Sequence, residues 1–129
     1  MKRLLLIITF LNATLVLSQD RVIYPAVGFE HPSHLDVYVS VVECNNLPTI
    51  LVTTFNESPI RENLEVSFKI NIIDANGQSE IFYYPKRIYE FGKMEIESCD
   101  NAVNPNRSIL DWNNDNSNKQ INLIFDYED

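Results

Sequence analysis

The chain has 129 residues, of which 45% are hydrophobic and 11% aromatic, and its formal net charge at pH 7 is −8. This length fits one small domain, and the apolar content exceeds that of disordered chains. An acid excess of this size repels phosphate backbones, which argues against a nucleic-acid partner.

Residues 1–18 have the pattern of a secretory signal peptide. Two basic residues precede the largely apolar run Leu4–Leu17, and Ser18 fits the last position before a cleavage point. We therefore expect a mature domain over residues 19–129, in which 8 basic residues face 18 acidic ones. The apolar run is shorter than a membrane span requires, so we predict an exported, soluble protein without a membrane anchor.

The end of this leader, LVLSQD, resembles the leaders of exported proteins from Bacteroidota. The resemblance implies a periplasmic or cell-surface location. In a secreted protein of eukaryotic or viral origin, Asn56 and Asn106 would instead begin N-glycosylation sequons.

Alternating apolar and polar residues predict a series of β-strands along the mature chain. Residues 19–33 form an irregular lead-in, within which Val22–Tyr24 can pair as an edge strand. The next strands are predicted over residues 35–44, 49–56, 62–73, 79–91 and 93–99.

Particular residues punctuate these strands. Asn76-Gly77 predicts a tight hairpin turn with positive φ angles. Pro85 is typical of an edge strand or of a crossing between sheets. Residues 100–118 are rich in Asn, Asp and Ser and predict a long exposed loop. A last strand is predicted beyond this loop, where alternate residues face inward: Ile121, Leu123, Phe125 and Tyr127.

Two cysteines, Cys44 and Cys99, predict one disulfide in an exported chain. Each follows an aliphatic run at the end of a predicted strand, so both strand ends must lie at the same end of the domain. Three predicted strands separate them, and their own strands therefore run in the same direction. Two buried thiols or a free reactive pair are the alternatives.

Six to seven strands without a helical period predict an all-β, antiparallel sandwich. The stretch from Asn63 to Ile96 has a long alternating strand, a hairpin and a turn at Gly92. It resembles the immunoglobulin-like modules of small exported proteins of Bacteroidota. That resemblance implies an immunoglobulin-like β-sandwich and says nothing of the function.

Two groups of residues are candidate metal ligands. Asp111, Asn113 and Asp115 place oxygens at alternate positions, as the first half of a calcium loop does, although Asn122 stands where a bidentate glutamate is needed. The alternative is a polar loop whose Trp112 packs back onto the sandwich. No cofactor is predicted apart from this calcium pattern.

The histidines His31 and His34 can also hold a borderline metal with Asp36, but a spacing of three points them to opposite sides of an extended chain. We therefore favour two surface histidines. Glu95 and Glu97 share one face of a predicted strand, about 7 Å apart, as the two carboxylates of a glycosidase do. The preferred interpretation is the solvated polar face of an antiparallel strand.

An aromatic cluster lies in the predicted strand 79–91. Alternation sends about half of its members inward, which favours core packing over a ligand platform. The platform hypothesis uses Trp112, Tyr83 and Tyr84. The full cluster is Phe82, Tyr83, Tyr84, Tyr89 and Phe91.

Together these features favour a non-enzymatic, periplasmic or cell-surface interaction or assembly module with a protein or surface-glycan partner. The partner would contact loop 100–118 or an exposed sheet edge. The alternative is a calcium- or carbohydrate-binding surface module. A small hydrolase with carboxylate chemistry is a third hypothesis.

Overall fold

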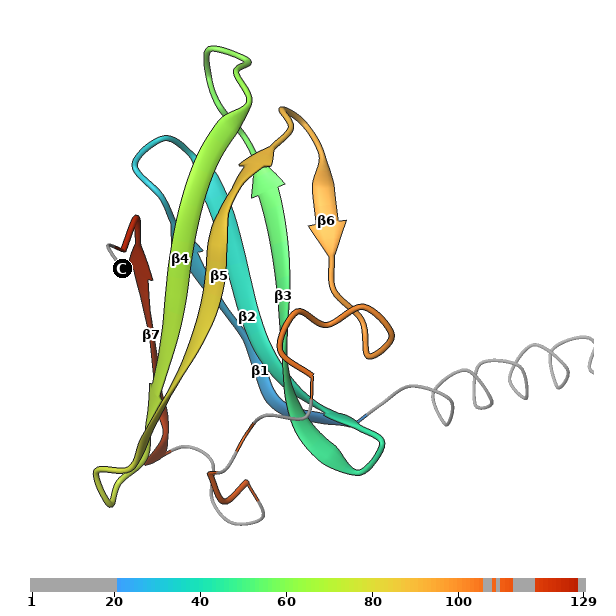
Figure 1. Cartoon of the computed structure of the whole chain (residues 1–129), viewed down its shortest axis with the longest axis vertical. Helices are drawn as coiled ribbons and strands as arrows, with labels where there is room; N and C mark the ends of the chain where they lie inside the picture. The colour runs from blue at the N-terminus through green and yellow to red at the C-terminus, as the bar shows by residue number, and fades with distance from the viewer. Residues whose placement is uncertain (1–20, 106–107, 109, 113–117, 128–129) are drawn as a thin grey trace, which may run out of the picture.

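Segments of alternating polarity form the strands of two antiparallel sheets in the computed structural model of the chain (Figure 1). The structure describes residues 21–105, 108, 110–112 and 118–127, so the predicted leader lies outside it. One sheet has the order β1-β2-β3-β6 and the other the order β5-β4-β7. The strands are β1 (Val22–Glu30), β2 (Leu35–Cys44), β3 (Leu47–Asn56), β4 (Leu64–Ile73), β5 (Ser79–Tyr89), β6 (Met94–Ile96) and β7 (Gln120–Phe125).

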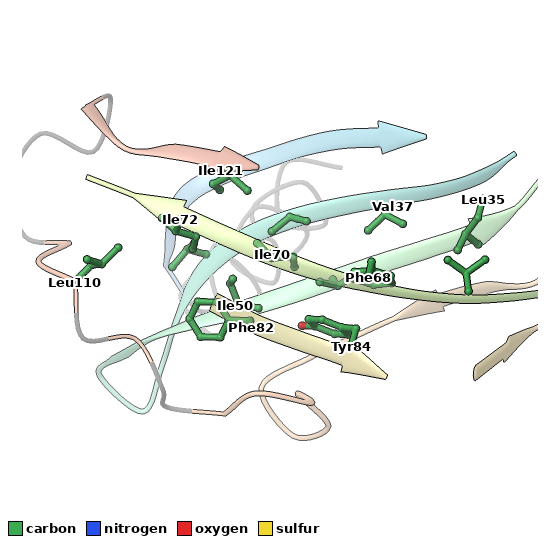
Figure 2. Close-up of a cluster of buried hydrophobic side chains, with 14 of the residues drawn as sticks. Leu35, Val37, Ile50, Phe68, Ile70, Ile72, Phe82, Tyr84, Leu110 and Ile121 are labelled. Atoms are coloured by element: carbon green, nitrogen blue, oxygen red, sulfur yellow. The ribbon is translucent and has the colours of Figure 1, made fainter. Parts of the chain in front are cut away.

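The core lies between the two sheets and is built mainly from β2 and β4. Alternate side chains are buried over residues 35–41 of β2 and 66–72 of β4, as the sequence predicts, and Ser67 is buried as well. Figure 2 shows the buried side chains between the layers, and within one sheet the Phe68 ring of β4 stacks on its cross-strand partner Tyr84 of β5 at a centroid distance of 4.7 Å. The central members of the core are Leu35, Val37, Val39, Val41, Val66, Phe68, Ile70 and Ile72.

This architecture confirms the predicted all-β, antiparallel sandwich, whereas its immunoglobulin-like character stays a prediction. No helix in the described residues is long and apolar enough to cross a membrane.

Two hairpins connect neighbouring strands. Between β2 and β3, Asn45 and Asn46 both have positive φ, which gives a two-residue turn. The hairpin predicted between β4 and β5 is present, but only Gly77 of the Asn-Gly pair has positive φ. The reason is Asp74, whose carboxylate accepts the backbone N–H groups of Asn76 and Gln78 at 2.9 Å each and so sets a wider turn.

Prolines lie in the edge strands of both sheets. β5 is an edge strand, and its register with β4 shifts so that Pro85 and Lys86 lie opposite one residue of β4. The predicted edge position of Pro85 is therefore confirmed. β1 runs from Val22 to Glu30, longer than predicted, because an edge strand with two register shifts tolerates Pro25.

Asn56, the last residue of β3, joins three segments of the chain. Its side-chain amide donates to the carbonyl groups of Glu62 and Tyr89, at 2.9 Å each. Its side-chain oxygen accepts the N–H of Ser58 at 2.9 Å. The residue is fully buried, so these bonds satisfy a polar group that has no access to water.

The disulfide between Cys44 and Cys99 is present, with a Cα–Cα distance of 5.5 Å. β2 and β6 both pair antiparallel to β3, so they run in the same direction. Cys44 ends β2, and Cys99 lies three residues beyond the end of β6. Both the pairing and the strand direction predicted from the cysteines are therefore confirmed.

Removing this disulfide with the double substitution Cys44→Ala and Cys99→Ala should lower the free energy of unfolding by about 4 kcal/mol. The bond closes a loop with a sequence separation of 55, and cross-linking restricts the unfolded chain by about this amount. Urea unfolding of the two proteins measures the change. A loss below about 1 kcal/mol would contradict this restriction of the unfolded chain as the source of the stabilisation.

Candidate functional site

The polarity of β6 is the reverse of what a sandwich edge requires for folding alone. Its apolar side chains, Met94 and Ile96, are 54% and 63% exposed. Its acidic neighbours, Glu95 and Glu97, are half-buried and face the space between the sheets. The preferred interpretation of the two glutamates as a solvated face was therefore wrong. The three-residue strand is short, so its pattern alone does not say which face points inward.

Glu97 is held by three hydrogen-bond donors. One carboxylate oxygen accepts the Val52 N–H at 2.7 Å and the Tyr84 hydroxyl at 3.2 Å. The other oxygen accepts the Val103 N–H at 3.1 Å. The Glu97 N–H also donates to the Val52 carbonyl at 3.1 Å, so residue 97 continues the β6 attachment to β3.

Burial raises the pKa of Glu97 above 4.5, although the donated hydrogen bonds from Val103, Val52 and Tyr84 oppose this shift. Burial also raises the pKa of the Tyr84 phenol, and the Glu97 charge adds to this effect. The Tyr84 hydroxyl therefore keeps its proton at neutral pH and serves as a donor to Glu97.

Glu95 is engaged by cationic side chains. Its carboxylate pairs with the Arg87 guanidinium, and Lys93 Nζ lies 3.7 Å from it. Arg87 also lies over the ring of Tyr89, at 4.4 Å from the ring centroid. These pairs are partly exposed, and pairs of this kind typically stabilise a fold by less than about 1 kcal/mol.

A cavity of about 200 Å³ opens between β5 and β6, and we call it the β5–β6 cleft. In Figure 1 these two strands belong to different layers of the sandwich. Buried core residues, Val52 and Phe68, line its inner part, while the exposed Ile96 and Val103 line its mouth. Arg87, Glu95 and Glu97 contribute its charged groups. A concave, partly apolar site with a few convergent polar groups is the usual form of a binding site.

The proposed aromatic platform does not assemble as one surface. Tyr84 points into the core, as Figure 2 shows, and Tyr83, the next residue, points to solvent. Tyr83 instead meets Tyr127 at a ring-centroid distance of 5.5 Å, and Lys69 Nζ lies 5.9 Å from the centroid of the Tyr127 ring. The pairing with Tyr127 was missed because that residue was predicted to face inward. Asp126, with φ of 52°, turns the chain just before it.

Trp112 is buried and packs back onto the sandwich, as the polar-loop alternative predicts. Its Nε1 donates to the Ser108 hydroxyl at 2.6 Å, and this hydroxyl donates to Glu80 at 2.9 Å. The Leu110 N–H donates to the same Glu80 carboxylate at 2.8 Å. The expectation of a wholly exposed loop was therefore wrong for three described residues, which are buried: Asn104, Leu110 and Trp112.

The predicted calcium ligands are described only in part. Asp111 is exposed, while Asn113 and Asp115 lie outside the described residues. In the ranges that the structure covers, no group of three His, Cys, Asp or Glu side chains is arranged to hold a metal ion. Calcium binding stays a prediction.

The two histidines pair with different carboxylates. The expectation of two surface histidines holds for His34, but it was wrong for His31, whose side chain is only 11% exposed. His34 Nδ1 lies 2.9 Å from Glu30, and His31 Nε2 lies 2.6 Å from Asp126. The Ser33 N–H donates to His31 Nδ1, which places the proton of the neutral ring on Nε2, facing Asp126. His31 thereby links the connection after β1 to the end of β7 in the opposite sheet.

No family model matches the chain, and no curated protein or solved structure matches it at a significant level. The function must therefore be argued from the residues of this chain.

Replacing Glu97 by Ala should lower the free energy of unfolding by about 2–4 kcal/mol, because two backbone N–H groups lose their acceptor in a half-buried place. Chemical denaturation measures the change. Glu95→Ala is the matched control, two residues away on the same face, and should cost less than about 1 kcal/mol. Equal losses in the two variants would contradict the structural role of Glu97.

The difference in the free energy of unfolding between wild type and Glu97→Ala should depend on pH. Because the folded chain raises the pKa of Glu97 above 4.5, it holds this proton more tightly than the unfolded chain. The contribution of Glu97 to stability is therefore fullest below pH 4.5 and falls as pH rises through the folded pKa. The stability difference between wild type and Glu97→Ala should be larger at pH 4 than at pH 7, and the increase should equal the free energy that corresponds to the pKa shift of Glu97. A difference that shrinks on acidification would contradict the direction of the shift.

Proposed function

We propose that the protein is an exported, non-enzymatic interaction module that binds a protein partner at the β5–β6 cleft. The partner offers an apolar side chain on an extended segment, which enters between the two strands. The observation that carries this proposal is the reversed polarity of β6, with Met94 and Ile96 exposed beside the cleft.

Folding alone does not account for this arrangement. Burying an apolar side chain stabilises a domain by about 1.5–3 kcal/mol, and burying a carboxylate is costly unless it is hydrogen-bonded. In β6 the apolar side chains Met94 and Ile96 are exposed, and the carboxylates of Glu95 and Glu97 are half-buried. Alternation requires residue 96 to point outward once Glu97 points inward, but it does not require that residue to be isoleucine. Exposed apolar side chains next to a cavity are typical of an interaction site.

The charged groups of the cleft support binding rather than catalysis. Glu97 already accepts three hydrogen bonds, and Glu95 is paired with Arg87 and Lys93. A general acid or base must reach a proton of the substrate, and these carboxylates are committed to neighbours in the fold. They instead fix the walls of the cleft through these contacts.

Export is supported by two independent features. The first is the signal-peptide pattern of residues 1–18, which resembles leaders from Bacteroidota. The second is the Cys44–Cys99 disulfide, since such bonds persist in oxidising compartments. A periplasmic or cell-surface protein that meets other exported proteins fits both.

Site-specific photo-cross-linking in the exporting cell tests the proposal. A photoreactive phenylalanine analogue replaces Ile96 at the mouth of the cleft, and a second protein carries it at Ile60, which is 69% exposed in the connection between β3 and β4. We expect a discrete protein adduct from position 96 and none from position 60, since only the former borders the cleft.

A second substitution tests whether the adduct forms at the cleft. With the photoreactive residue at Val103, which also lines the mouth, Ile96→Asp should abolish the same adduct because it places a charge at the contact. Adducts of equal yield from positions 96 and 60, or an adduct that survives Ile96→Asp, would contradict binding at the β5–β6 cleft.

A further inference from the structure

The sheet formed by β1, β2, β3 and β6 has one side that points away from the core (Figure 1). In β2 and β3 the buried core residues alternate with residues that face outward. In β6, Met94 and Ile96 face outward because Glu95 and Glu97 point inward. We call this side the outer face, and its members in these three strands are Asp36, Tyr38, Ser40, Leu51, Thr53, Phe55, Met94 and Ile96.

The strand register sets the apolar members of the outer face side by side. Met94 lies opposite Phe55, and Ile96 lies opposite Thr53. Thr53 lies opposite Tyr38 on its other side. Directly opposite residues on one face of an antiparallel pair have Cβ atoms about 4.5–5.5 Å apart. The exposed apolar side chains of β6 therefore continue across β3 to β2.

The Tyr38 ring lies against the backbone of β1. Gly28 is its partner in the register, and a Cβ atom on Gly28 would lie 3.1 Å from Tyr38 Cε1 and 3.3 Å from Cδ1. A side chain at residue 28 would crowd the ring, so glycine lets the ring lie close to the sheet. A ring placed in this way before binding loses little conformational entropy in a contact, and tyrosine is enriched among residues that carry binding energy.

Folding alone does not account for the composition of the outer face. The solvent side of an antiparallel sheet is commonly polar. Here Tyr38 is 42% exposed, Met94 and Ile96 are exposed as well, and Leu51 and Phe55 are half-buried between them and the sheet edges. Aromatic residues and methionine are enriched in the cores of protein–protein interfaces. The outer face therefore has the composition of a surface that another protein covers.

One end of the outer face is acidic. Glu30 and Asp36 lie directly opposite each other in the register, and like charges in such a pair destabilise a sheet. Glu57 follows β3 at the same end. A hydrogen bond with Asp36 and the negative charges of Asp36 and Glu30 raise the pKa of the Glu57 carboxyl, while the nearby His34 opposes this shift. His34 pairs with Glu30 at 2.9 Å, and one histidine can balance only one of three carboxylates.

This acidic end indicates which kind of partner fits. A second copy of the chain would bring charge of the same sign, since residues 19–129 hold 8 basic and 18 acidic residues. A membrane with anionic lipids would be repelled in the same way. A protein with arginine or lysine side chains at this end would instead relieve the repulsion among the carboxylates and form charge-assisted hydrogen bonds with them.

We propose that the outer face docks a second exported protein, which presents an apolar patch bordered by arginine or lysine side chains. The patch covers Tyr38, Phe55 and Ile96, and the basic side chains meet Asp36 and Glu57. Ile96 borders both this face and the β5–β6 cleft. The inference therefore rests on the proposed function for the existence of the partner, and it extends the contact from the cleft over the sheet.

Photo-cross-linking at Tyr38 in the exporting cell tests the proposal. The photoreactive phenylalanine analogue replaces Tyr38 in one protein and Tyr83 in the matched control, because Tyr83 is 49% exposed on the other sheet. We expect position 38 to give the same adduct as position 96, and position 83 to give none. Peptide mapping by mass spectrometry should place the cross-link beside arginine or lysine residues of the partner.

A charge reversal tests the acidic end. With the photoreactive residue at position 38, Glu57→Lys should lower the adduct yield about tenfold or more, because it places like charges in contact. The substitution also removes repulsion with Asp36, and circular dichroism checks that the variant is folded. Glu65→Lys is the matched control, with the same charge change at an exposed residue of β4 in the other sheet. It should leave the yield unchanged.

The outcomes separate the outer face from the cleft. An adduct at position 96 without one at position 38 would overturn the outer face and leave the cleft. Adducts at 38 and 96 without one at Val103, which lines the cleft, would contradict the cleft and leave the outer face. No adduct at either 38 or 96 would overturn both proposals.

Three further results would overturn docking of a basic partner. The first is an adduct with twice the mass of one chain, which would mean a second copy. The second is a cross-linked partner surface without arginine or lysine. The third is an equal loss of yield in Glu57→Lys and Glu65→Lys, since the effect of charge would then not depend on the acidic end of the outer face.

Discussion

The carboxylate of Glu97 fixes the open side of the sandwich, and the candidate site depends on it. β6 pairs with β3 over only three residues, which is too short a ladder to hold the following chain in place. Glu97 continues the attachment through its side chain, by accepting N–H groups from β3 and from Val103. Two residues later the Cys44–Cys99 disulfide ties the chain to the end of β2. These two attachments hold one wall of the β5–β6 cleft.

The same carboxylate couples stability to the surface that we propose for binding. Because side chains alternate along a strand, an inward Glu97 commits Ile96 to solvent. Any change that turns Glu97 out also turns Ile96 in and closes the apolar mouth of the cleft. The stability of the fold and the surface that we propose for binding therefore depend on the same three-residue strand.

Features that depend on regular alternation or on chain connectivity were predictable from the sequence. The long strands of β2 and β4 repeat their pattern over enough residues to reveal the buried face, and the cysteines and Pro85 constrain strand direction and edges. The site was not predictable in the same way. β6 is too short to show its orientation, and a single positive φ at Asp126 moves Tyr127 to the other face. Burial of Trp112 depends on Glu80, which lies on a distant strand.

Asn56 has a consequence for how the protein is produced. The triplet Asn56-Glu57-Ser58 is a glycosylation sequon, and oligosaccharide is attached to such sites as the chain enters the secretory pathway, before folding is complete. The nitrogen that would carry the sugar is the one that must donate to Glu62 and Tyr89 inside the fold. A sugar on this nitrogen would break at least one of these two hydrogen bonds at a position without access to water, so the fold requires the unmodified side chain.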